Sequence, residues 1–229
     1  MQHPYLFFNK LFGLIGLGHF ATEYPQVVYS WVVMALLIIA GALCAKGLTL
    51  VPSKAQNVFE LIVSGLEEFM VTVTGDEGRW FFPLVGTIFI YIFVSNLIGM
   101  VPGFYPPTAS LNTTLACALV VFVFTHAVGI KYHGTHYIKH FLGPVWWMIP
   151  IIMPIEIIGH LARVLSLSFR LFGNMMGHEL VLGILFMLAG AFLAPLPIMA
   201  LGIFVAFVQA FIFFLLSTMY FAGAMEEAH

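Results

Sequence analysis

The sequence predicts an all-α, polytopic membrane protein with about five membrane-crossing helices, an amphipathic interfacial helix, and a last pair of helices forming a long tilted hairpin. Hydrophobic residues make up 62% of its 229 residues and charged residues only 8%, against about 45–50% and about 25% in soluble domains. No Lys, Arg, Asp or Glu occurs within 24–45, 80–130 or 180–225, and each crossing needs about 20 apolar residues. Soluble and disordered proteins are therefore excluded. A nucleic-acid binder is excluded as well, because it would need a basic patch.

We expect one membrane domain, covering 1–229, without an internal repeat or a soluble part. Its predicted elements are, in order, an N-terminal interfacial segment, a span, an amphipathic helix, two further spans, a long tilted helix and a return helix, at 1–23, 24–45, 52–74, 80–101, 113–130, 144–193 and 198–223.

The segment 52–74 differs from the spans in its pattern. Apolar residues such as Val58 and Ile62 recur at helical spacing, and acids such as Glu60 and Glu67 lie on the other side. This pattern is typical of a helix that lies on the membrane surface rather than crossing it.

The segment between Pro154 and Pro195 is too long for one upright span. Its 40 residues contain no proline, and a continuous helix of that length would extend about 60 Å. The hydrocarbon core is about 30 Å thick. The segment therefore either breaks into two spans or crosses as one strongly tilted helix, and Pro195 and Pro197 end it with a turn.

Basic residues predict the orientation. Five of them fall in the two loops that would share one side of the membrane, namely Lys46, Lys54, Arg79, Lys131 and Lys139, whereas Lys10 lies on the other side. The positive-inside rule places these loops in the cytoplasm. We expect the N-terminus in the periplasm, the C-terminus in the cytoplasm, and a bacterial inner membrane as the location.

Three charged residues of the long segment share one helical stripe. Glu156, Arg163 and Arg170 are spaced seven apart, which is about 20° short of two full turns, and Asn174 extends the stripe by one turn. Glu179 follows Arg170 by nine residues and points the opposite way, with His178 beside it. Charge inside a membrane costs about 2.5–3.5 kcal/mol per residue on insertion scales, so these residues are candidates for function.

Simpler explanations compete for some of these residues. Glu156 and Arg163 could form a packing ion pair or snorkel to an interface. Arg170 has no acid three or four residues away, so its permanent charge must face water or another subunit. Gln209 could be a packing amide or a partner for Arg170, whereas His178 with Glu179 could relay a proton.

The other histidines and the cysteines favour ordinary roles. His126 and His160 are more readily explained by packing than by function, and the cluster His133, His136 and His140 is better explained by a wet loop than by a metal site. Cys44 and Cys117 lie in apolar segments and predict no disulfide. We predict no bound metal and no cofactor.

Four stretches, in the right order along the chain, resemble subunit a of the F-type ATP synthase. They are SLSFRLFGNMMGHEL at 166–180, NLIGMVP at 96–102, TASLNTT at 108–114, and QAFIF at 209–213 with Tyr220. The resemblance implies a stator that offers two aqueous half-channels to a ring of hairpin subunits (c) bearing carboxylates, with peripheral-stalk subunit b and the lipid bilayer as further partners.

The resemblance also implies roles for individual residues. Arg170 matches the family's essential arginine, and the polar channel and interface positions are matched by Glu156, Asn174, His178, Glu179, Gln209 and Tyr220. The last two helices are implied to be a strongly tilted hairpin around the ring. Two positions depart from the pattern. Ser110 stands where many relatives carry an acid. Gly202 stands where some relatives carry a charged residue or histidine, so the resemblance assigns proton handling to His178 and Glu179 alone.

We therefore predict a proton-translocating subunit that is not itself an enzyme. It has no Gly-rich phosphate loop and no GKS or GKT, so we expect no nucleotide binding, and no nucleic-acid partner. The alternatives are a sodium-coupled version of the same subunit, a haem-binding membrane oxidoreductase suggested by nine histidines, and a stand-alone transporter.

Overall fold

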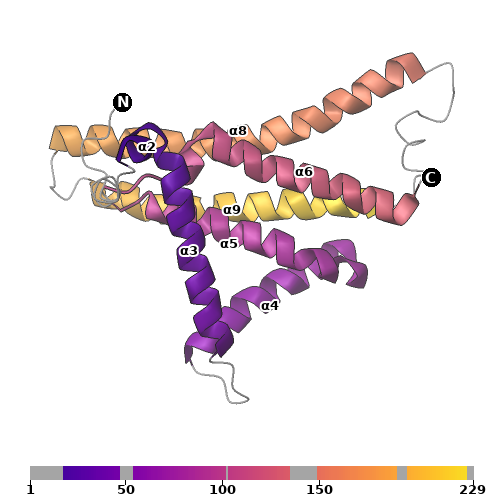
Figure 1. Ribbon diagram of the computed structural model, residues 1–229, viewed down its shortest axis with the longest axis horizontal. Helices are drawn as coiled ribbons and strands as arrows, with labels where there is room; N and C mark the ends of the chain where they lie inside the picture. Colours follow the sequence, from indigo (N-terminus) through magenta and orange to yellow (C-terminus); the bar gives the residue numbers. More distant parts are fainter. Residues whose placement is uncertain (1–17, 47–53, 102, 135–148, 190–194, 226–229) are drawn as a thin grey trace.

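The computed structural model describes residues 18–46, 54–101, 103–134, 149–189 and 195–225 (Figure 1). The helices of these ranges are, in chain order, α2 (Gly18–Glu23), α3 (Pro25–Lys46), α4 (Lys54–Thr74), the 3-10 helix η1 (Asp76–Phe81), α5 (Phe82–Ile98), the 3-10 helix η2 (Pro107–Ala109), α6 (Leu111–His133), α8 (Ile149–Ala189) and α9 (Pro195–Met225).

Within the described ranges, five helical segments are long and apolar enough to cross a membrane. They are Pro25–Ala45, Asp76–Ile98, Leu111–His133, Ile152–Leu188 and Leu196–Met225. No strand is formed by the part of the chain that the structure describes. The predicted all-α polytopic fold is confirmed.

Of the two alternatives left open for the long segment, the structure has the continuous helix. α8 runs for 41 residues with Pro154 inside it, and its length is about 60 Å. Because the hydrocarbon core is only about 30 Å thick, a helix of this length stays in the membrane only when strongly tilted. α9 returns alongside α8 in the opposite direction (Figure 1).

The remaining spans differ in direction. α5 and α6 run beside the α8–α9 pair, whereas α3 crosses them at a steep angle (Figure 1). Buried aromatic rings hold η1 and α5 against α9. Phe81 contacts Phe221 with ring centroids 5.6 Å apart, and Phe89 contacts Phe214 at 5.9 Å. Such ring pairs bury large apolar areas and prefer tilted or edge-on geometry, so they fix one packing of these helices.

The apolar side of α4 is buried only in its C-terminal half. Leu66 and Met70, in its C-terminal half, are buried in the core, whereas Val58, Leu61 and Ile62 are exposed. The C-terminal half therefore packs on the bundle, and the N-terminal half leaves apolar side chains for another surface. This distribution supports the predicted interfacial position.

Hydrogen bonds tie the loop after α5 to α5 and α3, and tie α5 to α9. Thr108 Oγ1 donates to Asn96 Oδ1 at 2.6 Å, and Asn96 Nδ2 donates to the carbonyl oxygen of Ala206 on α9 at 3.4 Å. On α3, Tyr29 Oη donates to the carbonyl oxygen of Gly103 at 3.2 Å. Each bond satisfies a polar group that would otherwise be costly to bury, so the loop is held against α3 and α5, and α5 is held against α9.

Candidate functional site

Arg170 lies on a side of α8 that no described helix covers. Its side chain is exposed, and so is the apolar side chain of Phe169, the residue before it. The exposed residues on the Arg170 side of α8, called here the open face, are Gly159, Ala162, Arg163, Ser166, Arg170, Gly173, Asn174 and Gly177.

The open face contains several small residues. Gly159, Gly173 and Gly177 each have nothing within 4 Å of the position that a Cβ atom would take. Small residues let another helix approach closely in a membrane. The open face therefore combines a surface suited to close helix contact with a permanent positive charge.

One turn beyond Arg170, a hydrogen bond connects α8 to α9. Asn174 Nδ2 donates to Gln209 Oε1 at 2.7 Å, and Gln209 is only 3% exposed. Of the two interpretations of Gln209, the structure therefore favours an amide that packs between helices, with Asn174 as its partner. The bond fixes the side chain of Asn174 at the edge of the open face.

Toward the C-terminal end of α8, His178 and Glu179 meet the loop after α5 and the start of α9. The imidazole of His178 lies directly against Gly202, and a Cβ added at Gly202 would overlap its Nε2 and come within 3.0 Å of the Met100 side chain. His178 Nε2 is buried and has no hydrogen-bond partner among the described residues. The ring thus occupies the space that a side chain at position 202 would need.

Tyr105 belongs to the same region. Burial, together with the negative charge of Glu179, raises the pKa of the Tyr105 phenol to about 12. The phenol is therefore protonated at every physiological pH, and it contributes to this region as a neutral hydrogen-bonding group. We name the group formed by Tyr105, His178, Glu179 and Gly202 the C-terminal cluster.

A substitution at Gly202 tests this packing. We expect Gly202→Ala to destabilise the assembled protein by about 1–3 kcal/mol, the usual cost of overpacking, because the new methyl group would overlap the His178 ring. Combining it with His178→Ala should recover most of the loss, since the space is then free. Thermal denaturation of the purified complex measures both effects. Simple additivity of the two substitutions would contradict the packing.

Toward the N-terminal end of α8, the charged residues meet α6 and α9. His160 Nε2 lies 3.2 Å from Glu156 Oε1, and the rings of His126 and His160 are edge to face with centroids 4.9 Å apart. The guanidinium carbon of Arg163 lies 5.6 Å from the centre of the Tyr220 ring. We name these five residues the N-terminal cluster.

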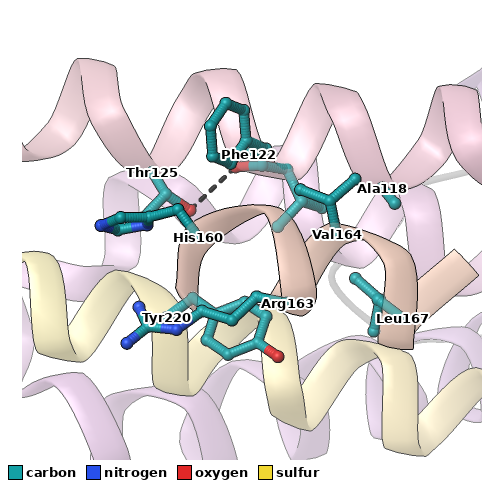
Figure 2. A pocket seen from close by; sticks show the side chains of 9 residues that line it. Ala118, Phe122, Thr125, His160, Arg163, Val164, Leu167 and Tyr220 are labelled. Carbon is teal, nitrogen blue, oxygen red and sulfur yellow. Dashed lines mark hydrogen bonds between the residues drawn. The ribbon is translucent and has the colours of Figure 1, made fainter. Parts of the chain in front are cut away.

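A small cavity of about 20 Å³ borders this cluster. Figure 2 shows its lining, with Thr125 and Phe122 from α6, His160 and Arg163 from α8, and Tyr220 from α9. The Arg163 side chain extends along the Tyr220 ring. A packing ion pair between Glu156 and Arg163 was one of the explanations left open for these residues. In the described structure Glu156 contacts His160 instead, and Arg163 stacks on the Tyr220 ring.

The structure thus divides the predicted site residues among four places. Arg170 and Asn174 lie on the open face, His178 and Glu179 in the C-terminal cluster, and Glu156 and Tyr220 in the N-terminal cluster, whereas Gln209 lies between α8 and α9. Along α8, Glu156 precedes Arg170 by 14 residues, or about 21 Å, and Glu179 follows it by nine, or about 14 Å.

Sequence reasoning missed several polar contacts. The hydroxyls of Thr114 on α6 and Ser168 on α8 are hydrogen-bonded at 3.2 Å, and the roles of Asn96 and Tyr105 were not foreseen. His133 Nε2 is 3.2 Å from the carbonyl oxygen of Ala224, whereas His136 and His140 lie outside the described residues. In the described ranges, no three His, Cys, Asp or Glu residues are grouped to hold a metal ion.

The chain is similar to known proteins over its full length. Residues 27–222 match the family described as ATP synthase A chain. The chain is 74% identical to ATP synthase subunit a of Desulfosudis oleivorans and 59% identical to that of Syntrophobacter fumaroxidans, over the whole length of both chains in each case. It is 52% identical, again over full length, to ATP synthase subunit a of Trichlorobacter lovleyi. This chain therefore belongs to the ATP synthase A chain family.

Proposed function

We propose that this chain is the proton-conducting stator subunit in the membrane sector of an ATP synthase, with the C-terminal and N-terminal clusters as its two half-channels. The observation that carries the proposal is the position of Arg170. It is exposed on a face of small residues, and a titratable cluster lies on either side of it along the same helix. The membership of the family supports the same role, and it supports neither a haem-binding oxidoreductase nor a stand-alone transporter.

The proposed partner of the open face is a ring of small hairpin subunits (c), each bearing a membrane carboxylate. A guanidinium about 4 Å from a carboxylate stabilises its charged form by about 4 kcal/mol at an effective dielectric constant of about 20. That energy corresponds to about three pKa units. A ring carboxylate that arrives opposite Arg170 therefore loses its proton, and it regains one only after moving away.

The same charge separates the two half-channels. A proton passing directly from the C-terminal cluster to the N-terminal cluster would have to pass a permanent cation, and arginine does not deprotonate in proteins. Protons therefore cross only by travelling on the ring. Each proton that crosses 100 mV releases about 2.3 kcal/mol, so several are needed for each ATP formed elsewhere in the complex.

The proposed orientation follows from the basic residues. Four basic residues lie near helix ends: Lys46 at the end of α3, Lys54 at the start of α4, Arg79 in η1 just before α5, and Lys131 near the end of α6. The positive-inside rule assigns these ends to the cytoplasm. The C-terminal cluster then opens to the periplasm of a bacterial inner membrane and the N-terminal cluster to the cytoplasm. We propose peripheral-stalk subunit b as a second partner and a role without nucleotide binding or catalysis of its own.

Two serines of α8 provide a matched test of the open face. Ser166 is exposed and Ser168 is fully buried. With Cys44 and Cys117 replaced by alanine, we expect Ser166→Cys to cross-link to a cysteine on the carboxylate-bearing helix of the ring subunit, and Ser168→Cys not to. Immunoblots of the intact complex measure the product. Failure of Ser166→Cys to cross-link at every ring position tried would contradict the proposed interface.

A further inference from the structure

His160 lies at the centre of the N-terminal cluster and contacts titratable groups on two helices. On its own helix, Glu156 contacts its Nε2 at 3.2 Å, and the side chains of His160 and Glu156 are 13% and 31% exposed. On α6, His126 packs edge to face against it at 4.9 Å, and Phe122 holds both rings, with centroid distances of 4.2 Å to His126 and 6.3 Å to His160. His160 is therefore fixed in place, with its Nε2 directed at a carboxylate.

The remaining charged and titratable groups around the ring complete its surroundings. Arg163 and Tyr220 line the same small cavity as His160, together with Thr125 (Figure 2). Arg163 stacks on Tyr220 and is one turn nearer to Arg170 than His160 is. Along α8, His160 thus lies between Arg163 and Glu156, and Glu156 is the nearest of the three to the N-terminal end of the helix.

We infer that His160 is a proton carrier on the N-terminal side of Arg170 and passes protons to Glu156. This inference rests on the proposed function and names a residue of that half-channel. Histidine suits the task because its two ring nitrogens accept and donate protons near neutral pH. A proton binds to one nitrogen of the neutral ring, and the proton on Nε2 moves to the Glu156 carboxylate, which later releases it to water.

His126 has a positioning role in this scheme. Its ring is held against that of His160 by Phe122, so it limits the orientations in which Nε2 of His160 faces Glu156. Two protonated imidazoles at this separation would repel each other, so the pair carries one proton at a time. The pathway is therefore a sequence of single transfers.

The test compares His160→Gln with His133→Gln in the complete complex. Glutamine keeps a hydrogen-bond donor toward Glu156 but carries no proton. His133 lies at the end of α6, where it contacts the Ala224 carbonyl. In membranes from which the catalytic sector has been stripped, we expect His160→Gln to lower passive proton conductance per complex by about 10- to 100-fold, at or below the usual contribution of a positioned acid–base group. His133→Gln should match the unsubstituted protein.

Two further readouts separate proton transfer from packing. The conductance of the unsubstituted protein should vary with pH across the histidine range, and this variation should be lost in His160→Gln. In His160→Ala, added imidazole should restore conductance, because a diffusible ring replaces the missing one. If conductance per complex and its pH profile are unchanged in His160→Gln, or if imidazole restores nothing in His160→Ala, the relay is wrong.

Failure of the His160 relay can be distinguished from failure of the proposed function. If Arg170→Ala and Glu179→Gln impair proton transport while His160→Gln does not, the relay fails and the two half-channels stand. If Arg170→Ala retains coupled transport, the proposed function itself fails.

Discussion

Replacing Arg170 by alanine is expected to abolish ATP-driven proton pumping, with a loss of at least about 100-fold. The variant removes the charge that forces each ring carboxylate to release its proton, a stabilisation of about 4 kcal/mol at 4 Å. It also removes the barrier between the two half-channels. Because Arg170 is exposed and no described helix packs over it, the loss should occur with normal amounts of assembled complex. Quenching of a pH-sensitive dye in inverted membrane vesicles measures the effect.

Two controls make the Arg170 prediction specific. Arg170→Lys keeps a positive charge but replaces the planar fork by a point charge that can deprotonate, so we expect partial activity at most. Arg163→Ala removes a cation from the same open face, but one that stacks on Tyr220 in the N-terminal cluster, so pumping should fall much less than in Arg170→Ala and remain coupled. Coupled pumping in Arg170→Ala, or equal losses in Arg163→Ala, would show that charge on the open face has no position-specific role.

Replacing Glu179 by glutamine is expected to slow proton uptake by about 10- to 100-fold while the complex still assembles. Glutamine has nearly the same shape as glutamate but cannot carry a proton, and a positioned acid–base group typically contributes a rate factor of this size or more. Tyr105 cannot replace the carboxylate, because its pKa of about 12 keeps it protonated. Passive proton conductance of stripped membranes, with the complex quantified by immunoblot, measures the effect.

Glu60 provides the matched control for Glu179. It lies on the exposed side of α4 and accepts a hydrogen bond from Gln56 at 2.7 Å, away from both clusters. Glu60→Gln should therefore conduct protons normally. Normal proton uptake in Glu179→Gln would show that Glu179 only packs and does not carry protons. His178 would then be the side chain of the C-terminal cluster left to carry them.

The single-helix geometry of the site could be predicted from sequence. The stripe that joins Arg163, Arg170 and Asn174 follows from helical periodicity, and all three side chains are exposed on one face of α8. The contact between Glu156 and His160 could have been predicted by the same reasoning. Seven residues separate it from Arg163, about 10 Å along the axis, whereas His160 is four residues away and within direct reach.

The contacts between helices could not be predicted in this way. Asn174 meets Gln209, Arg163 meets Tyr220, and His178 meets Gly202, and these three contacts follow one antiparallel register of α8 and α9. A shift by one helical turn would move every contact by about 5.4 Å without changing the apolar pattern of either helix. The register is set by packing, including the absence of a side chain at Gly202, which hydrophobic periodicity alone does not specify.

The central claim is that Arg170 faces the rotor carboxylate between two separate proton paths. A structure of the intact complex tests it most directly, through the distance from the Arg170 guanidinium to the nearest ring carboxylate. We predict one ring carboxylate within about 4–6 Å, the range in which an opposite charge favours ionisation, with the C-terminal and N-terminal clusters reaching water on opposite sides of the membrane. A ring that packs elsewhere on the chain, with Arg170 facing lipid or another subunit, would contradict the account.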